Sequence, residues 1–174
     1  MRKNSTKLLK QIFFSVTLAL TLSGCQVLPL NQNAAVVHDE YINTGDILPI
    51  DSITTIDGQE LNLHQLGRRK LVILFATWCH DSNRLLKALN SSALLDSDDI
   101  DIIAIAREED LETVTAWRDK RGIKVAIAVD ENRAIYKRFA SGGIPRLIMV
   151  GENNKIIKMN LAEGEQQLDQ IVWQ

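Results

Sequence analysis

Cysteine is scarce in this chain: Cys25 and Cys79 are the only two among 174 residues. Two cysteines cannot build a disulfide scaffold, so the fold must rest on a hydrophobic core. The length leaves room for one domain of ordinary size and a short extra segment. With 45% hydrophobic and 24% charged residues, the composition is that of a globular protein rather than a disordered or fibrous one.

An excess of basic charge is missing from most of the chain. Residues 1–24 contain four of the 20 basic residues and no acidic one, which leaves 16 basic against 22 acidic residues in the remainder. An acidic body of this kind gives no reason to expect a nucleic acid as partner. The adjacent Cys79, His80 and Asp81 are all metal-competent, but neighbours at a helix start rarely converge on one ion. We therefore expect no metal and no cofactor.

The N-terminal region lacks a hydrophobic run long enough to cross a membrane. The apolar stretch over residues 12–22 has 11 residues, whereas a spanning helix needs about 20. A basic start, a short apolar stretch and small residues behind it are typical of a secretory signal peptide. We therefore predict that residues 1–24 are a cleaved signal peptide; the alternative is a short anchor helix that is not cleaved.

The segment Leu22-Ser23-Gly24-Cys25 resembles the lipobox of bacterial lipoproteins. The resemblance implies that Cys25 carries acyl chains such as palmitate and becomes the mature N-terminus. Two or more acyl chains hold a protein stably at a membrane. Gln26 stands where an Asp would favour retention at the inner membrane, so we expect a periplasm-facing protein of the cell envelope, anchored in the outer membrane. The alternative is that Cys25 merely lies near an ordinary cleavage site.

Behind Cys25, residues 25–44 show no sustained period, and we interpret them as a flexible tether. From residue 45 onward, short β-type patterns alternate with helical ones, which predicts an α/β fold with a mixed central sheet flanked by helices. Trp117 and Trp173 stand at helical spacing among apolar neighbours and are expected in the core. The predicted strands are residues 53–56, 60–63, 70–76, 100–106, 125–129, 146–150 and 155–159, and the predicted helices are residues 80–95, 110–121, 131–140 and 165–173.

Cys79 stands where the buried strand over residues 70–76 gives way to a helix. The free backbone N–H groups and the positive dipole end of a helix start stabilise a thiolate. The thiolate is the nucleophilic form of cysteine, so this placement favours a reactive thiol. His80 would add positive character when protonated, Asp81 would oppose it, and Trp78 would shelter one side of the sulfur.

Several motifs together resemble the thioredoxin superfamily, and within it the extracytoplasmic TlpA-like branch. The resemblance covers most of residues 45–174 and implies one thioredoxin-like domain there. It also implies that Pro145 follows a cis peptide bond and faces Cys79, and that Trp78, Ile144 and Pro145 shape a groove for an extended peptide. The matching residues are Gly45, Pro49, Asp57, Gly58, Leu61, Leu63, Leu66, Gly67, the run 75–79 and Gly143-Ile144-Pro145.

One departure from this family pattern changes the expected chemistry. The family active site is Cys-x-x-Cys, but Ser82 occupies the second cysteine position and Asp81 replaces the proline often found before it. If Cys25 is lipidated, Cys79 is the only free thiol, and no second thiol releases a mixed disulfide within the chain. At most, Ser82 would donate a hydrogen bond to the Cys79 thiolate.

Two functions remain open. In the first, the chain is a monothiol thiol-disulfide oxidoreductase in which Cys79 forms mixed disulfides with thiol- or disulfide-containing proteins or a small thiol. In the second, a thioredoxin-fold module without catalysis binds a partner protein through the same groove. A peroxidase of the peroxiredoxin type is disfavoured, because Val72 and Ala76 occupy the places of its Pro and Thr.

The anchor assignment predicts the behaviour of Cys25→Ala. Because the acyl chains would be attached to this sulfur, the variant should lose all lipid labelling and should not be processed at that site. Labelling with a radioactive or clickable fatty acid checks the first effect, and the mass of the N-terminal peptide checks the second. Unchanged labelling of the variant would contradict the assignment.

Overall fold

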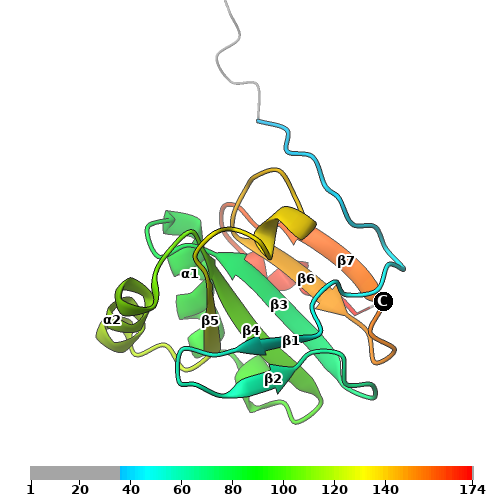
Figure 1. Ribbon diagram of the computed structural model, residues 1–174, viewed down its shortest axis with the longest axis horizontal. Helices are drawn as coiled ribbons and strands as arrows, with labels where there is room; N and C mark the ends of the chain where they lie inside the picture. Colours follow the sequence, from blue (N-terminus) through cyan, green and yellow to red (C-terminus); the bar gives the residue numbers. More distant parts are fainter. Residues whose placement is uncertain (1–35, 174) are drawn as a thin grey trace, which may run out of the picture. The chain divides into compact units, whose positions relative to one another are not determined.

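The computed structural model describes residues 36–173 of the chain. The predicted signal peptide, Cys25 and the first part of the predicted tether lie outside these residues. The described part contains a five-stranded sheet in the order β5-β4-β3-β6-β7 and a separate two-stranded sheet, β1-β2 (Figure 1). The strands are β1 (Ser52–Thr54), β2 (Glu60–Asn62), β3 (Arg69–Phe75), β4 (Ile100–Arg107), β5 (Ala126–Asp130), β6 (Arg146–Val150) and β7 (Ile156–Leu161); the helices are α1 (His80–Asn90) and α2 (Leu111–Arg121).

The central sheet is mixed, as the pattern of strands and helices predicts. β3 pairs in parallel with β4, which in turn pairs in parallel with β5. On its other edge β3 pairs antiparallel with β6, and β6 with β7. A strand with neighbours on both edges and layers on both faces requires a nearly continuous apolar run, and residues 71–75 provide it.

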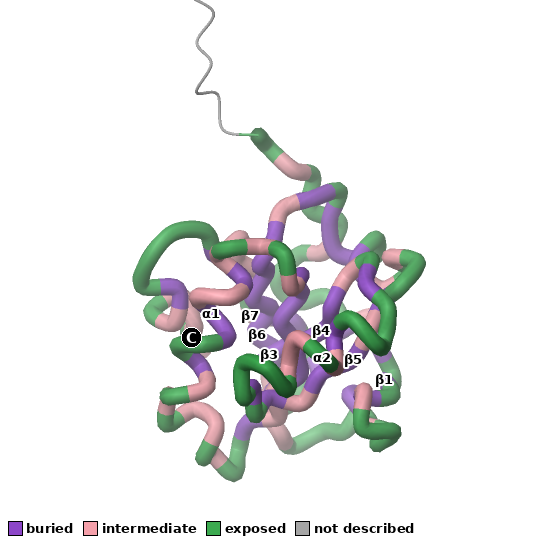
Figure 2. The backbone as a smooth tube through the Cα atoms, turned by 90° about the vertical axis from the view of Figure 1, so that its left-hand side faces the viewer, coloured by how far each residue is buried: buried purple, intermediate pink, exposed green. Residues whose placement is uncertain are grey.

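Alternation along β3 divides the core into two layers. Leu71, Ile73 and Phe75 pack with the leucines of α1 on one face of the sheet. Val72 and Leu74 point to the other face and pack with residues from the β1-β2 hairpin and the segment before it. Successive side chains of a strand point to opposite faces, so both layers meet at this one strand. Figure 2 shows the buried backbone concentrated along the sheet.

The helix α2 begins and ends at residues that favour helix ends. The Asp110 carboxylate accepts a hydrogen bond from the Thr113 backbone N–H at 2.7 Å, and this bond lowers the pKa of that carboxyl. At the other end of α2, Gly122 adopts the left-handed conformation with φ of 61°, which costs a glycine little. The prediction of this helix is confirmed. None of the helices within residues 36–173 has the length and apolar character that crossing a membrane requires.

The helix predicted over residues 131–140 is wrong. Only a short 3₁₀ helix, η2 (Tyr136–Arg138), forms there. The Asp130 carboxylate accepts hydrogen bonds from the backbone N–H groups of Ile135 and Tyr136 at 3.0 and 2.7 Å. Arg133 has a φ of 63°, which a helix cannot contain. The segment is a turn that buries Tyr136 and Phe139 on the sheet rather than a helix.

The predicted C-terminal helix over residues 165–173 is also wrong. Gln166 has a φ of 56°, and only the 3₁₀ helix η3 (Gln167–Gln170) follows. The buried Gln167 amide donates to the carbonyls of Ala162 and Asp81 at 2.5 and 3.0 Å. The contact with Asp81 attaches the segment to α1. The spacing of apolar residues within 165–173 gives no sign of such a contact. Trp117 and Trp173 do pack against the core, but at its edge, where both stay partly exposed.

The helix predicted over residues 80–95 ends early. α1 stops at Asn90, and residues 93–96 form a separate 3₁₀ helix, η1 (Ala93–Asp96). The Ser92 hydroxyl accepts a hydrogen bond from the Leu94 N–H at 3.2 Å and so caps this second turn. Serine at such a position favours a new start over a continuous helix.

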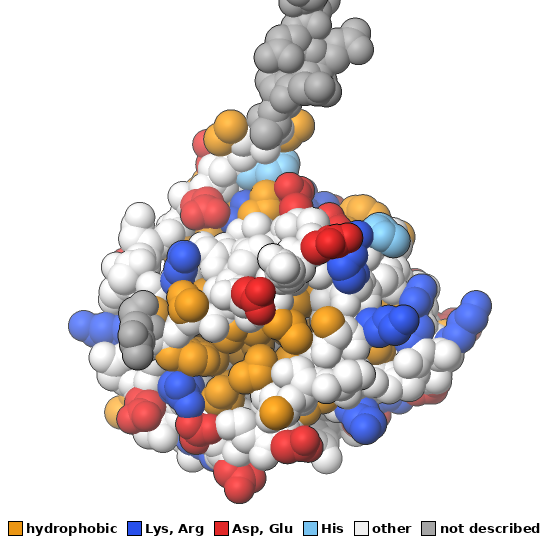
Figure 3. All heavy atoms as spheres, turned by 180° about the vertical axis from the view of Figure 1, so that it is seen from behind, with side chains coloured by type: hydrophobic (Ala, Val, Ile, Leu, Met, Phe, Trp, Pro, Cys, Tyr) orange, Lys and Arg blue, Asp and Glu red, His pale blue; other side chains and the backbone are white. Residues whose placement is uncertain are grey.

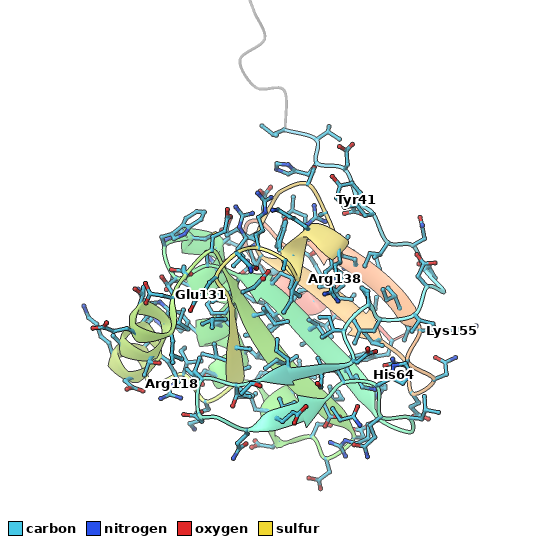
Figure 4. The ribbon with its side chains drawn as sticks, viewed as in Figure 1. Tyr41, His64, Arg118, Glu131, Arg138 and Lys155 are labelled. Atoms are coloured by element: carbon cyan, nitrogen blue, oxygen red, sulfur yellow. The ribbon has the colours of Figure 1, made fainter. Side chains whose placement is uncertain are left out.

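The last residues of the predicted tether lie against the domain. Glu40 forms a β-bridge with Ala140, and the Tyr41 N–H donates to the Phe139 carbonyl at 2.8 Å. Figure 4 shows Tyr41 on this segment, which runs along the domain. The buried Arg146 guanidinium donates to the Glu40 carboxylate at 2.5 Å and to the Gly142 carbonyl at 2.7 Å. Residues 39–44 are therefore part of the folded body, where the sequence predicts flexibility.

This arrangement predicts that Glu40→Ala destabilises the domain. The substitution leaves a buried guanidinium N–H without its acceptor, which should lower the free energy of unfolding by about 1–3 kcal/mol. Urea unfolding followed by circular dichroism measures the change. The matched control is Glu131→Ala, because Glu131 is exposed (Figure 4) and should change stability by less than about 0.5 kcal/mol. Equal stability of both variants would show that the ion pair contributes nothing.

Candidate active site

Cys79 is the N-cap residue of α1, directly behind the short turn that follows β3. Its sulfur accepts a hydrogen bond from the Ser82 backbone N–H at 3.5 Å, and the residue is partly exposed. An N–H group at a helix start and the helix dipole both favour negative charge at this position. The structure therefore places a partly exposed sulfur beside a backbone N–H donor at a helix start.

The loop of residues 142–145, which we call the proline loop, faces this sulfur. The Ile144–Pro145 peptide bond is cis, which confirms what the family resemblance implies. The Cys79 Sγ lies 3.7 Å from the Ile144 carbonyl oxygen, to which the thiol donates. The sheet explains the contact, since β3 leads to Cys79 while its antiparallel neighbour β6 begins directly after Pro145.

The proline loop is itself held from behind. Tyr136 Oη donates to the Gly143 carbonyl at 2.6 Å, and the Arg146 guanidinium donates to the Gly142 carbonyl. The His38 ring lies against the same loop, so closely that a Cβ on Gly142 would be 2.4 Å from its Nδ1. Glycine at this position therefore permits the close approach of the ring.

Ser82 stands one helical turn after Cys79 and is fully buried. Its Oγ lies 3.4 Å from the Ala76 backbone N–H, from which it accepts a hydrogen bond. The contact that Ser82 makes with the Cys79 sulfur comes from its backbone N–H. Cys79 is the one free cysteine of residues 36–173.

The other motif residues surround the sulfur to different degrees. His80 is exposed, and the indole of Trp78 projects into solvent, with 66% of the residue accessible. The Asp81 carboxylate forms an ion pair with Arg84 at 2.5 Å. This neighbouring cation balances the negative charge that Asp81 brings to the helix start.

Two further residues, Asn83 and Glu109, position the Cys79 turn, and neither was predicted from the sequence. The Asn83 amide donates to the carbonyls of Thr77 and Cys79 at 2.6 and 2.7 Å, and its oxygen accepts from the Trp117 indole N–H at 3.0 Å. The Glu109 carboxylate, 9% exposed, accepts from the Thr77 N–H at 2.7 Å and from the Thr77 hydroxyl. Asn83 stands four residues behind Cys79, a spacing that points to the same helix face; nothing local points to Glu109.

Metal-ligating side chains do not gather at the site. Residues 36–173 contain no group of three His, Cys, Asp or Glu side chains placed to hold an ion. His64 is exposed, and its Nδ1 lies 3.4 Å from the Asp51 carboxylate. The chemistry that the arrangement supports is that of the Cys79 sulfur.

Comparison with protein families agrees with this geometry. The family model described as Redoxin matches residues 43–171, about three quarters of the chain. The chain belongs to the Redoxin family. The predicted thioredoxin-like fold, a mixed sheet flanked by helices, is thereby confirmed, and so is the assignment to the thioredoxin superfamily. A search of curated proteins gave no match.

Solved structures share the fold of this Redoxin-family chain. A candidate protein disulfide isomerase from Bacteroides thetaiotaomicron is 24% identical with a TM-score of 0.67, and the match covers 75% of this chain and 86% of that one. A secreted Mycobacterium tuberculosis disulfide oxidoreductase, homologous to E. coli DsbE, is 16% identical with a TM-score of 0.58 and coverages of 68% and 89%. A peroxiredoxin-like protein from Aquifex aeolicus is 15% identical with a TM-score of 0.59 and coverages of 69% and 76%.

The hydrogen bonds of Asn83 predict the effect of Asn83→Ala. The substitution leaves two carbonyls and the Trp117 indole without this partner, so the Thr77–Cys79 turn should loosen and stability should fall by about 1–3 kcal/mol. Urea unfolding measures the loss, and iodoacetamide alkylation of Cys79 measures the looser turn. Gln59→Ala serves as control, because this exposed amide lies in the β1-β2 turn. Stability and alkylation equal to those of the control would contradict the positioning role.

Proposed function

We propose that this Redoxin-family protein catalyses thiol-disulfide exchange through the single thiol of Cys79. The observation that carries the proposal is the position of the Cys79 sulfur, partly exposed, 3.5 Å from the Ser82 N–H and 3.7 Å from the Ile144 carbonyl. The first group donates a hydrogen bond to the sulfur, and the second belongs to the loop where an extended substrate would lie. A cysteine with a purely structural role would be buried and inert.

The reaction has two steps. In the first, the Cys79 thiolate attacks one sulfur of a substrate disulfide; a bond from Cys79 to that sulfur forms, the substrate S–S bond breaks, and the other half leaves as a thiolate that takes up a proton. In the second, an external thiolate attacks the mixed disulfide at the substrate sulfur and releases Cys79. No electrons are gained or lost overall, because one disulfide is exchanged for another.

The external thiol is required by the residue at position 82. In a dithiol enzyme, a second cysteine one turn along the helix would release the mixed disulfide within the same chain. The buried Ser82 hydroxyl cannot do so. Disulfide-containing proteins are the partners of the first step, and thiol-containing proteins or small thiols are the partners that supply the release.

The proposed substrate groove runs between Trp78 and the proline loop. Trp78 exposes a large apolar surface on one side of Cys79, and Ile144 and Pro145 lie on the other. His80 and Asp81 complete the active-site motif with Cys79 and Ser82. An extended peptide beside Pro145 would add backbone contacts to those of the side chains.

The proposed location is the cell envelope, facing the periplasm. It is supported by the signal-like residues 1–24 and by the lipobox-like segment that ends at Cys25, with Gln26 favouring the outer membrane. The Mycobacterium tuberculosis neighbour is described as secreted. In this proposal the thioredoxin-like domain carries the site, and the residues between Cys25 and the folded body, which includes residues 39–44, connect it to the lipid.

Ser82→Cys tests the proposal. If Cys79 exchanges as a single thiol, the wild-type protein should accumulate a mixed disulfide with insulin chains, detectable by mass spectrometry. In the variant, the introduced thiol one turn along the helix should release that species and form a disulfide with Cys79, with a gain in insulin reduction. Ser52→Cys, which adds an exposed thiol on β1, should not show this gain.

Other results would distinguish the two candidate functions. If the wild-type protein forms no mixed disulfide, and Cys79→Ser binds insulin chains as well as the wild type does, the exchange chemistry is wrong. The fold would then act as a binding module through the same groove. Turnover of the wild-type protein with dithiothreitol would instead support the exchange mechanism, with the small thiol performing the second step.

A further inference from the structure

A hollow of about 610 Å³ lies at the Cys79 turn, lined by residues on both sides of Cys79 in the chain but not by Cys79 itself. Trp78 and His80, the two neighbours of Cys79 in the chain, both line it, whereas the proline loop does not. A volume of this size is typical of sites for small molecules. The lining residues come from the Cys79 turn, from α1 and from the end of α2: Thr77, Trp78, His80, Asn83, Arg84, Lys87 and Arg121.

The lining is basic. It includes Arg84, Lys87 and Arg121 but no carboxylate. Arg84 pairs with Asp81, whereas Lys87 and Arg121 have no carboxylate within 4 Å among the residues that the structure describes. The chain as a whole carries a net charge of −2, so these unbalanced cations are a local feature. In Figure 3, basic side chains gather on the right, the side on which α1 and α2 lie.

The hollow continues along the two helices. A second hollow of about 260 Å³ shares Asn83, Lys87 and Arg121 with the first. The Arg121 guanidinium lies 5.8 Å from the centre of the Trp117 ring, a distance typical of a cation-π contact. This contact favours one placement of the guanidinium at the edge of the groove.

We propose that this basic groove binds the carboxylates of a small disulfide or thiol that exchanges with Cys79. The inference rests on the proposed function and adds the substrate class to it. Guanidinium and ammonium groups bind carboxylates through charge-assisted hydrogen bonds. The Trp78 ring provides an apolar surface for the carbon skeleton between the carboxylate and the sulfur.

The groove acts on both steps of exchange. A carboxylate bound at Lys87 and Arg121 holds the substrate sulfurs beside Cys79 during the attack, after which one half of the disulfide leaves as a thiolate and takes up a proton. In the second step, a carboxylated thiol bound in the same place attacks the mixed disulfide, forms the product disulfide and returns Cys79 to its thiol form. The cations bind and steer the reactant and exchange no electrons.

Two disulfides that differ in charge test the inference. In full-length protein carrying Cys25→Ala, Cys79 is the only thiol, and its reaction is followed by absorbance with 5,5′-dithiobis(2-nitrobenzoate), a dianion, and with 2,2′-dithiodipyridine, which is neutral. The double variant Lys87→Gln/Arg121→Gln should react about fivefold more slowly with the dianion, as expected from the loss of two exposed charge contacts. Its rate with the neutral disulfide should not change.

The controls separate charge from structure. Lys155→Gln removes an exposed cation on the far side of the domain (Figure 4) and should leave both rates unchanged. The charge-conserving double variant Lys87→Arg/Arg121→Lys should restore the rate with the dianion. In 0.5 M salt, screening should reduce the difference between the wild-type protein and the glutamine double variant.

Failure of the inference differs from failure of the proposed function. If the ratio of the two rates is the same in the wild-type protein and the glutamine double variant, the groove does not select carboxylates in small disulfides, and an acidic protein segment becomes the better occupant. If Cys79 reacts with neither disulfide, the exchange chemistry itself is wrong, and the inference fails with it.

Discussion

The structure depends on the burial of β3 between two neighbouring strands and two core layers. Its residues 71–75 are at most 1% exposed, and each apolar side chain belongs to one layer or the other. Burial of an aliphatic or aromatic side chain of this size contributes about 1.5–3 kcal/mol. A one-residue shift in register would exchange the two faces and disrupt both layers at once. This strand therefore determines where the turn behind it leaves the sheet, and that turn carries Cys79.

The strands that pair with the two edges of β3 position the residues around Cys79. Parallel pairing with β4 places Glu109 beneath the Thr77 turn, and antiparallel pairing with β6 places Ile144 opposite the Cys79 sulfur. Asn83 and Trp117 then connect the turn to α2. The Cys79 sulfur contacts the Ser82 N–H and the Ile144 carbonyl. The backbone of the turn around it is hydrogen-bonded to the side chains of Asn83 and Glu109. A rigid frame around an accessible thiol is the arrangement that a nucleophile requires.

The replacement at position 82 shapes the proposed chemistry more than any other single residue. A buried serine keeps the packing and the Ala76 contact of that position but removes the thiol that would release a substrate. In the proposed mechanism, release of the substrate then depends on a thiol from outside the chain. A basic groove beside Cys79 gives such a thiol a place to bind if it carries carboxylates. The serine at position 82 and the cationic lining of the groove both agree with the proposed exchange with an external carboxylated thiol.

Much of the fold can be predicted from local pattern alone. The apolar run of β3 and the caps at Asp110 and Gly122 each act within a few residues, so the strand and α2 agree with the structure. The position of Cys79 and the family motifs are also visible in the sequence. The predicted helices over residues 131–140 and 165–173 failed, because Asp130, Gln166 and Gln167 impose turns and contacts that compete with helical spacing.

The active-site surroundings were decided by tertiary structure. Glu109 reaches Thr77, and Lys87 meets Arg121 in one groove, because the sheet and helices bring together residues far apart in the chain. The same holds for residues 39–44, whose attachment depends on Arg146 and Ala140. The amino-acid sequence by itself determined the strand that leads to Cys79, the helix start after it and the serine in place of a cysteine at position 82, since these depend on neighbouring residues. Only long-range pairing decided which groups surround that sulfur.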